Sequence, residues 1–181
     1  MYAAISELSS REEQVVVWDY FKPRLTHAWN MLFISWRQLD REIEHGGFDT
    51  EYNWENFILR LWLYRTTVKT LIRLQVVKGD AKIALKEFDN VFGINGRNQL
   101  KALRDMIEHF DDYAAGVGKG PATRSGDLDP WRTFDRDRYE RGQFFLEREK
   151  SFAAATKLQL EAKCLSSAFI QWYKSDAVDD P

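Results

Sequence analysis

Apolar side chains recur every three or four residues through a long stretch that follows Pro23. An α-helix has about 3.6 residues per turn, so this spacing places them on one face of a helix. The run ends at Gly46 and Gly47, and glycine commonly terminates helices. We therefore expect helix over residues 3–45, either continuous or divided at Pro23, which lacks a backbone donor. The apolar positions are Trp29, Leu32, Phe33, Trp36, Leu39 and Ile43.

The same spacing predicts further helices along the chain. Asn53, Asp80 and Ser151 are residue types that cap helix N-termini, and each lies at or just before the start of an amphipathic stretch. The predicted helices cover residues 54–77, 80–92, about 98–115, and 151 onward.

The stretch between the last two predicted helices has a different pattern. Residues 116–130 are rich in Gly, Ser, Asp and Pro, which predicts a loop. Residues 131–149 favour either a small hairpin turning at Arg141–Gly142 or an irregular segment. Four arginines there interleave with aromatic and acidic side chains, which is consistent with an RNA-contacting segment but favours a self-paired surface. These arginines are Arg132, Arg136, Arg138 and Arg141.

The composition predicts one folded unit. A chain of 181 residues with 44% hydrophobic and 14% aromatic side chains is long enough for one core and too short for two. We expect a single helical domain over residues 1–175 and a frayed tail at 176–181. The fold class is all-α: an up-and-down bundle of five or six helices, with or without a small β-hairpin near 131–149.

Several classes of site are excluded or made improbable by the composition. The formal net charge of -2 provides no overall attraction to nucleic acid, so such a contact needs a local patch. Cys164 is the one cysteine, which excludes an internal disulfide and a Cys-based zinc site. Its position beside Leu165 predicts a buried thiol. His27 and His45 have no ligand spacing with His109, so we expect neither a metal nor a cofactor.

The sequence also lacks the signals of membrane insertion. The stretch MYAAISELSS has no basic region followed by a long apolar run, so it does not resemble a signal peptide. The most apolar stretch, residues 57–64, is interrupted by Arg60, whereas a membrane helix needs about 18 continuous apolar residues. We therefore expect a cytoplasmic protein without a membrane partner.

The segment that can carry chemistry is Leu103-Arg104-Asp105-Met106-Ile107-Glu108-His109. At about 100° per residue, Arg104 and His109 lie about 140° apart on a helix. They then flank the side opposite the apolar stripe, with Asp105 and Glu108 between them. We expect this polar face to be open to a ligand or a second subunit.

This pattern resembles the motif of the HEPN superfamily, in which Arg is followed after four to six residues by His. Arg104-Asp105-(x)₃-His109 is similar to it, with Asp105 where the family more often has Asn. The resemblance implies an all-α domain that dimerises, so that two motifs line one cleft and cut single-stranded RNA without metal. It also suggests a toxin or phage-defence role, with an antitoxin as a possible partner.

The resemblance implies a role for each residue of the motif. Arg104 would bind the scissile phosphate, His109 would transfer protons, and Asp105 and Glu108 would support them. These roles fit the chemistry, since imidazole titrates near neutrality and guanidinium matches phosphate. RNA-backbone contacts would come from Lys101 and from two cations in the following loop. The loop cations are Lys119 and Arg124.

Other interpretations of the same residues remain open. Arg104, Asp105, Glu108 and His109 would also be expected on a solvated helix face stabilised by i,i+4 charge pairs. The chain would then be a non-catalytic helical module for dimerisation or partner binding. A HEPN-like domain that binds nucleotides without cutting RNA is a further alternative.

Overall fold

The structure is a computed structural model that describes four stretches of the chain. Within them it contains five α-helices, two short 3₁₀ segments and a three-stranded antiparallel sheet. This confirms the predicted all-α fold with a small β-hairpin. The described stretches are residues 10–47, 49–92, 96–109 and 132–175.

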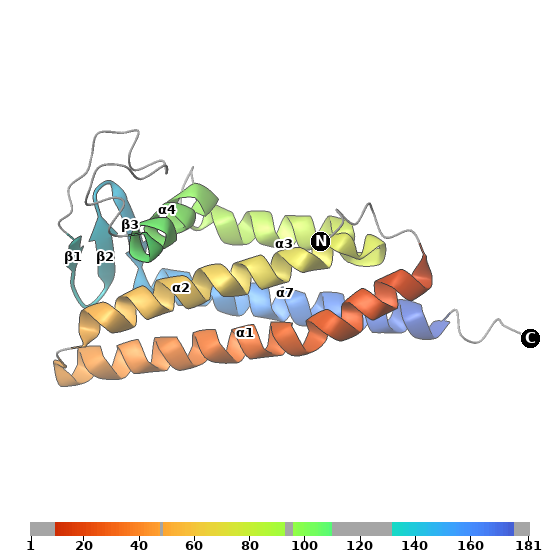
Figure 1. Cartoon of the computed structure of the whole chain (residues 1–181), viewed down its shortest axis with the longest axis horizontal. Helices are drawn as coiled ribbons and strands as arrows, with labels where there is room; N and C mark the ends of the chain where they lie inside the picture. The colour runs from red at the N-terminus through yellow and green to blue at the C-terminus, as the bar shows by residue number, and fades with distance from the viewer. Residues whose placement is uncertain (1–9, 48, 93–95, 110–131, 176–181) are drawn as a thin grey trace, which may run out of the picture.

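The helices form an up-and-down arrangement along one long axis (Figure 1). Helices α1 and α2 are an antiparallel pair. Helix α3 runs in the direction opposite to α2, and α7 packs against α3. The short helix α4 and the sheet lie at the end where α1 turns into α2 (Figure 1). The elements are α1 (Arg11–His45), α2 (Thr50–Val68), η1 (Lys69–Arg73), η2 (Gln75–Val77), α3 (Lys78–Asn90), α4 (Gly96–Glu108), β1 (Arg132–Phe134), β2 (Arg138–Arg141), β3 (Phe144–Glu147) and α7 (Arg148–Ser175).

Helix α1 is continuous through Pro23, so the undivided alternative is the correct one. Its N-terminus is closed by a capping box, in which Ser10 Oγ accepts from the Glu13 amide at 3.1 Å and the Glu13 carboxylate accepts from the Ser10 amide. At the C-terminus Gly46 adopts the left-handed conformation, with φ 65°. The part of the prediction over residues 3–9 lies outside the described residues.

The helix predicted over residues 54–77 is shorter and begins earlier. Helix α2 starts at Thr50, so Asn53 lies inside it and is not the cap; its amide donates to the Asp49 carbonyl. The chain leaves helical geometry at Leu74, whose backbone is extended and whose side chain is buried. The main-chain N–H of Gln75 donates a hydrogen bond to the side-chain oxygen Oε1 of the buried Gln14 at 2.9 Å. This contact from α1 stabilises the break, which local sequence does not encode.

Two further helix starts were predicted too late. Helix α3 begins at Lys78, two residues before the proposed cap Asp80. Helix α7 begins at Arg148, and Ser151 donates its hydroxyl to the Glu147 carbonyl instead of capping the helix. In both places the chain enters the helix directly from the preceding element, without a separate capping residue.

The sheet confirms the hairpin and adds a strand. Strands β2 and β3 pair antiparallel, with Arg141 opposite Phe144, and Gly142 in their turn has φ 58°. Strand β1 pairs with the other edge of β2. Tyr139 of β2 is fully buried against Trp54 of α2, with 6.0 Å between ring centroids. The sheet therefore packs on the N-terminal end of α2.

The core is aromatic and follows the predicted apolar stripes. Trp54 is fully buried, and four other tryptophans pack partly buried against the core. The partly buried tryptophans are Trp29, Trp36, Trp62 and Trp172.

Cys164 departs from the prediction, because its side chain is exposed. It precedes the buried Leu165 by about 100° of helix rotation, which is enough to turn it out of the core.

A search of the described residues finds no helix with the length and apolar character needed to span a membrane.

Candidate functional site

Helix α4 is held against α2 and β3 by its apolar stripe. Leu100, Leu103 and Met106 are buried, as the spacing predicted. The helix ends at Glu108, and His109 lies in the turn that follows it. Helix α4 therefore ends one residue before His109, and the remaining part of the predicted helix, residues 110–115, lies outside the described residues.

Asp105 is buried, which corrects the prediction that it lies on an open polar face. Its side chain is only 10% exposed. It accepts a hydrogen bond from the Lys101 ammonium one turn earlier, and it forms an ion pair with Arg104 Nη2 at 2.9 Å. One buried carboxylate thus holds two cations from the same helix.

Arg104 also packs into the protein more than predicted, because its side chain is 20% exposed. Its guanidinium carbon lies 5.1 Å from the centroid of the Trp62 ring on α2. Nη1 pairs with Glu108, while Nε is buried and has no hydrogen-bond partner among the described residues. The guanidinium is therefore fixed from two sides, by the indole face and by Asp105.

Glu108 and His109 form the exposed part of the site. The Glu108 side chain is 43% exposed, and the His109 side chain is exposed as well. The His109 amide donates to the Asp105 carbonyl at 2.9 Å, which continues the helical hydrogen bonding by one residue. The imidazole is thus available to solvent at the C-terminal end of α4.

Arg141 fixes the same end of α4 from the sheet. It was expected on a self-paired surface, but it is buried. Nη1 donates to the main-chain carbonyl of Met106 at 2.7 Å, and Nη2 lies 3.4 Å from Glu55. This carbonyl belongs to the last turn of α4. Of the arginine-rich segment, Arg138 does pair locally as expected, with Glu140.

The structure brings four of the predicted site residues into one ion-paired group and sets His109 directly beyond it. The group comprises Lys101, Arg104, Asp105 and Glu108. The predicted RNA contacts Lys119 and Arg124 lie outside the described residues.

Two supporting residues were not foreseen from the sequence. Trp62 and Arg141 contact α4 from α2 and β2, far along the chain, and only the packing of these elements reveals them. The described residues contain no group of three or more His, Cys, Asp or Glu placed to hold a metal ion. No family model, curated protein or solved structure matches the chain.

Proposed function

We propose that this protein is a HEPN-like, metal-independent endoribonuclease that acts on single-stranded RNA as a homodimer. The observation that supports it best is the fixed guanidinium of Arg104, held between Trp62 and Asp105 and followed five residues later by the exposed His109. A preorganised phosphate-binding group and a proton-transfer group are both among the groups that 2′-hydroxyl attack on a phosphodiester requires.

The pair between Arg104 and Glu108 is compatible with phosphate binding. Exposed i,i+4 pairs contribute only about 0.3–0.5 kcal/mol, so a phosphate can replace Glu108 at little cost. The contacts to Asp105 and Trp62 would keep the guanidinium oriented during this exchange. Lys101, whose side chain is 40% exposed, supplies a second cation on the same face.

The proposed reaction needs both a proton acceptor for the 2′-hydroxyl and a proton donor for the leaving oxygen. Each chain offers one imidazole at this site, that of His109. A second copy related by a two-fold axis would supply the other. In this arrangement Asp105 is a positioning residue, since its carboxylate holds Arg104 and its carbonyl accepts from the His109 amide.

The cellular setting is part of the proposal. We infer a cytoplasmic toxin or phage-defence component, with an antitoxin as a protein partner. The two loop cations Lys119 and Arg124 would extend the contact with the RNA backbone.

The deciding experiment is cleavage of a labelled single-stranded RNA in excess chelator. Wild type should cut and leave a 2′,3′-cyclic phosphate, whereas Arg104→Ala and His109→Ala should lose at least about 100-fold in rate. His27→Ala and Arg37→Ala, at exposed positions of α1, are the matched controls and should cut normally. Equal activity in all five proteins would exclude the proposal.

A second candidate is a non-catalytic dimerisation or partner-binding module. It is favoured by the mutual pairing of Lys101, Arg104, Asp105 and Glu108, which serves helix stability without any ligand. Absence of cleavage in wild type would select this candidate. Thermal stabilisation by added nucleotide, also without cleavage, would instead select the nucleotide-binding alternative.

A further inference from the structure

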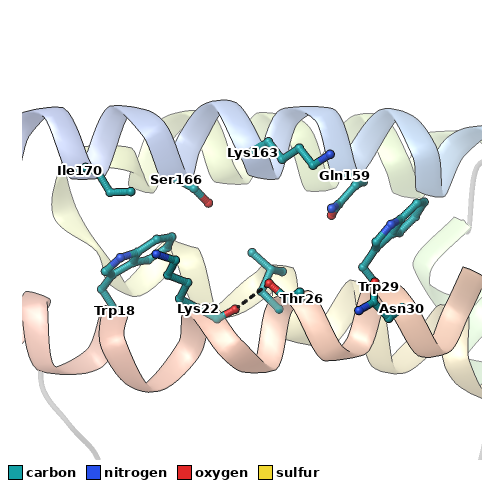
Figure 2. A pocket seen from close by; sticks show the side chains of 10 residues that line it. Trp18, Lys22, Thr26, Trp29, Asn30, Gln159, Lys163, Ser166 and Ile170 are labelled. Carbon is teal, nitrogen blue, oxygen red and sulfur yellow. Dashed lines mark hydrogen bonds between the residues drawn. The ribbon is translucent and has the colours of Figure 1, made fainter.

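A groove of about 420 Å³ lies between α1 and α7, on a part of the molecule that α4 does not line (Figure 2). Trp18, Lys22 and Trp29 face it from α1, and Gln159, Lys163 and Ser166 face it from α7. Its volume falls in the range of small-molecule sites, roughly 300–1,000 Å³.

Aromatic contacts at both ends hold the groove open. At one end Trp18 packs on Phe169, with 5.3 Å between ring centroids. At the other end Trp29 stacks on Phe152 at 6.2 Å. Between these contacts α7 presents the small side chain of Ser166, which leaves the space unfilled. Trp18 and Trp29 are 11 positions apart on α1, so the groove is about 16 Å long.

The inner wall is apolar and carries one oriented amide. Leu25 and Ile170 are half-buried and line the groove. The hydroxyl of the fully buried Tyr64 donates to Gln159 Oε1 at 2.6 Å. With its oxygen engaged in this way, the Gln159 amide keeps its two N–H donors for a ligand.

The charged groups of the groove are all of one sign. Lys22 and Lys163 stand on opposite walls, and no carboxylate is among the lining residues (Figure 2). Within the described residues neither ammonium is within ion-pair distance of a carboxylate. The hydroxyls of Thr26 and Ser166 already donate to main-chain carbonyls, so the donors left for a ligand include the two ammonium groups and the side-chain amides of Gln159 and Asn30.

We propose that this groove binds a small amphipathic carboxylate, whose apolar body lies on Leu25 between Trp18 and Trp29 and whose anionic head is held by Lys163 and Gln159, while Lys22 on the opposite wall adds positive charge at the Trp18 end. Two cations and a neutral donor set above an apolar wall select for an anion with an apolar body. The site is separate from α4, so binding here neither requires nor excludes ribonuclease activity.

The test uses the fluorescent anion 1-anilinonaphthalene-8-sulfonate on the full-length chain. We expect saturable binding at one site per chain, with competition by decanoate and none by decanol at the same concentration. Competition by decanoate identifies an alkyl carboxylate; competition by 1-naphthoate alone identifies an aromatic one. Either result supports the proposal, whereas equal displacement by decanol would overturn it.

Variants locate the site. Lys22→Gln with Lys163→Gln should weaken probe binding about tenfold or more, since each removes a charge-assisted contact. Ser166→Trp should fill the groove and abolish binding. Lys82→Gln with Lys86→Gln, at exposed positions of α3, is the matched control and should bind as wild type does. Unchanged binding in both groove variants, with melting temperatures preserved, would show that the probe binds elsewhere and refute the proposal.

Discussion

The guanidinium carbon of Arg104 lies 5.1 Å from the centroid of the Trp62 ring, so a residue of α2 supports the central cation of α4. A cation over an indole face gains about 0.5–2 kcal/mol, depending on how far it is desolvated. Trp62 is itself only partly buried, and the guanidinium carbon of Arg65 lies 5.7 Å from the centroid of the same ring. Its main role in the proposed site is to hold Arg104.

Replacing Trp62 with Leu should therefore slow RNA cleavage, because the ring no longer holds Arg104. We expect kcat/KM to fall about fivefold to tenfold, the equivalent of about 1 kcal/mol of lost positioning. Trp62→Phe keeps an aromatic face and should retain most of the activity. Chelator-resistant cleavage kinetics measure both variants; equal losses for Leu and Phe would argue against a role for the ring.

The helical elements were predictable because their signal is local. Spacing of apolar residues is enough to identify α1, α4 and α7, and Gly142 marks the hairpin turn. The break after α2 was missed because the side chain of Gln14 stabilises it from another helix. Capping preference wrongly placed Asn53 at the start of this helix, which begins at Thr50, so that Asn53 lies inside it.

The site was only partly predictable. The sequence predicted i,i+4 charge pairs on this helix, and Arg104 does pair with Glu108. It could not show that Asp105 is buried, because the burial of one position on a polar helix face depends on how other elements pack around α4. It also gave no sign of Trp62, which is brought to Arg104 by the packing of α2 against α4.

The link between α2 and α3 should depend on one buried ion pair. Arg65 Nε and Nη2 donate to both carboxylate oxygens of Asp89 at 2.8 and 2.6 Å, with the arginine only 5% exposed. Arg65→Met leaves Asp89 partly buried without its partner and should lower the free energy of unfolding by about 2–3 kcal/mol.

Urea unfolding monitored by circular dichroism measures this loss. Arg73→Met, at an exposed position nearby, should stay within about 0.5 kcal/mol of wild type. A double-mutant cycle with Asp89→Asn gives the interaction free energy between Arg65 and Asp89, apart from the other effects of each substitution. A coupling energy near zero would contradict the assigned role.

Burial raises the pKa of the Tyr64 hydroxyl above its usual range. In the unfolded chain it deprotonates near about pH 10, while the folded protein keeps the proton. The folded state then binds more protons, so stability is fully present below about pH 10 and is lost as the pH rises further, by up to about 1.4 kcal/mol per pH unit.

Tyr64→Phe should therefore flatten the alkaline loss of stability. It also removes the hydrogen bond to Gln159, which should cost about 1 kcal/mol at neutral pH. Urea unfolding at several values between about pH 8 and 11.5 measures both effects. Tyr20→Phe, at an exposed position, is the control and should keep the wild-type slope. If the free energy of unfolding falls with pH equally in wild type and in Tyr64→Phe, Tyr64 is not the cause of the alkaline loss of stability.

The exposed thiol of Cys164 should react readily in the folded protein. We expect Ellman's reagent to modify one thiol per chain without denaturant, at a rate close to that in urea. Cys164→Ser should change the free energy of unfolding by less than about 0.5 kcal/mol, because no core contact is lost. If the thiol reacts only after denaturation, Cys164 is buried in the folded protein, as the sequence predicted.

Arg141 should matter to the proposed site without touching RNA. Its Nη1 donates to the Met106 carbonyl in the last turn of α4, and the whole side chain is buried. Arg141→Met leaves that carbonyl and Glu55 without this donor and should destabilise the fold by about 2–3 kcal/mol. The last turn of α4 should loosen first, because it loses its tie to the sheet.

Hydrogen exchange distinguishes this local effect from global destabilisation. In Arg141→Met, the amides of residues 105–109 should exchange faster at a temperature where the rest of the protein stays protected. Arg138→Met, on the same strand but with a 42% exposed side chain, should leave them unchanged. If exchange in Arg141→Met rises equally throughout the helices, the residue supports the fold as a whole and does not specifically position His109.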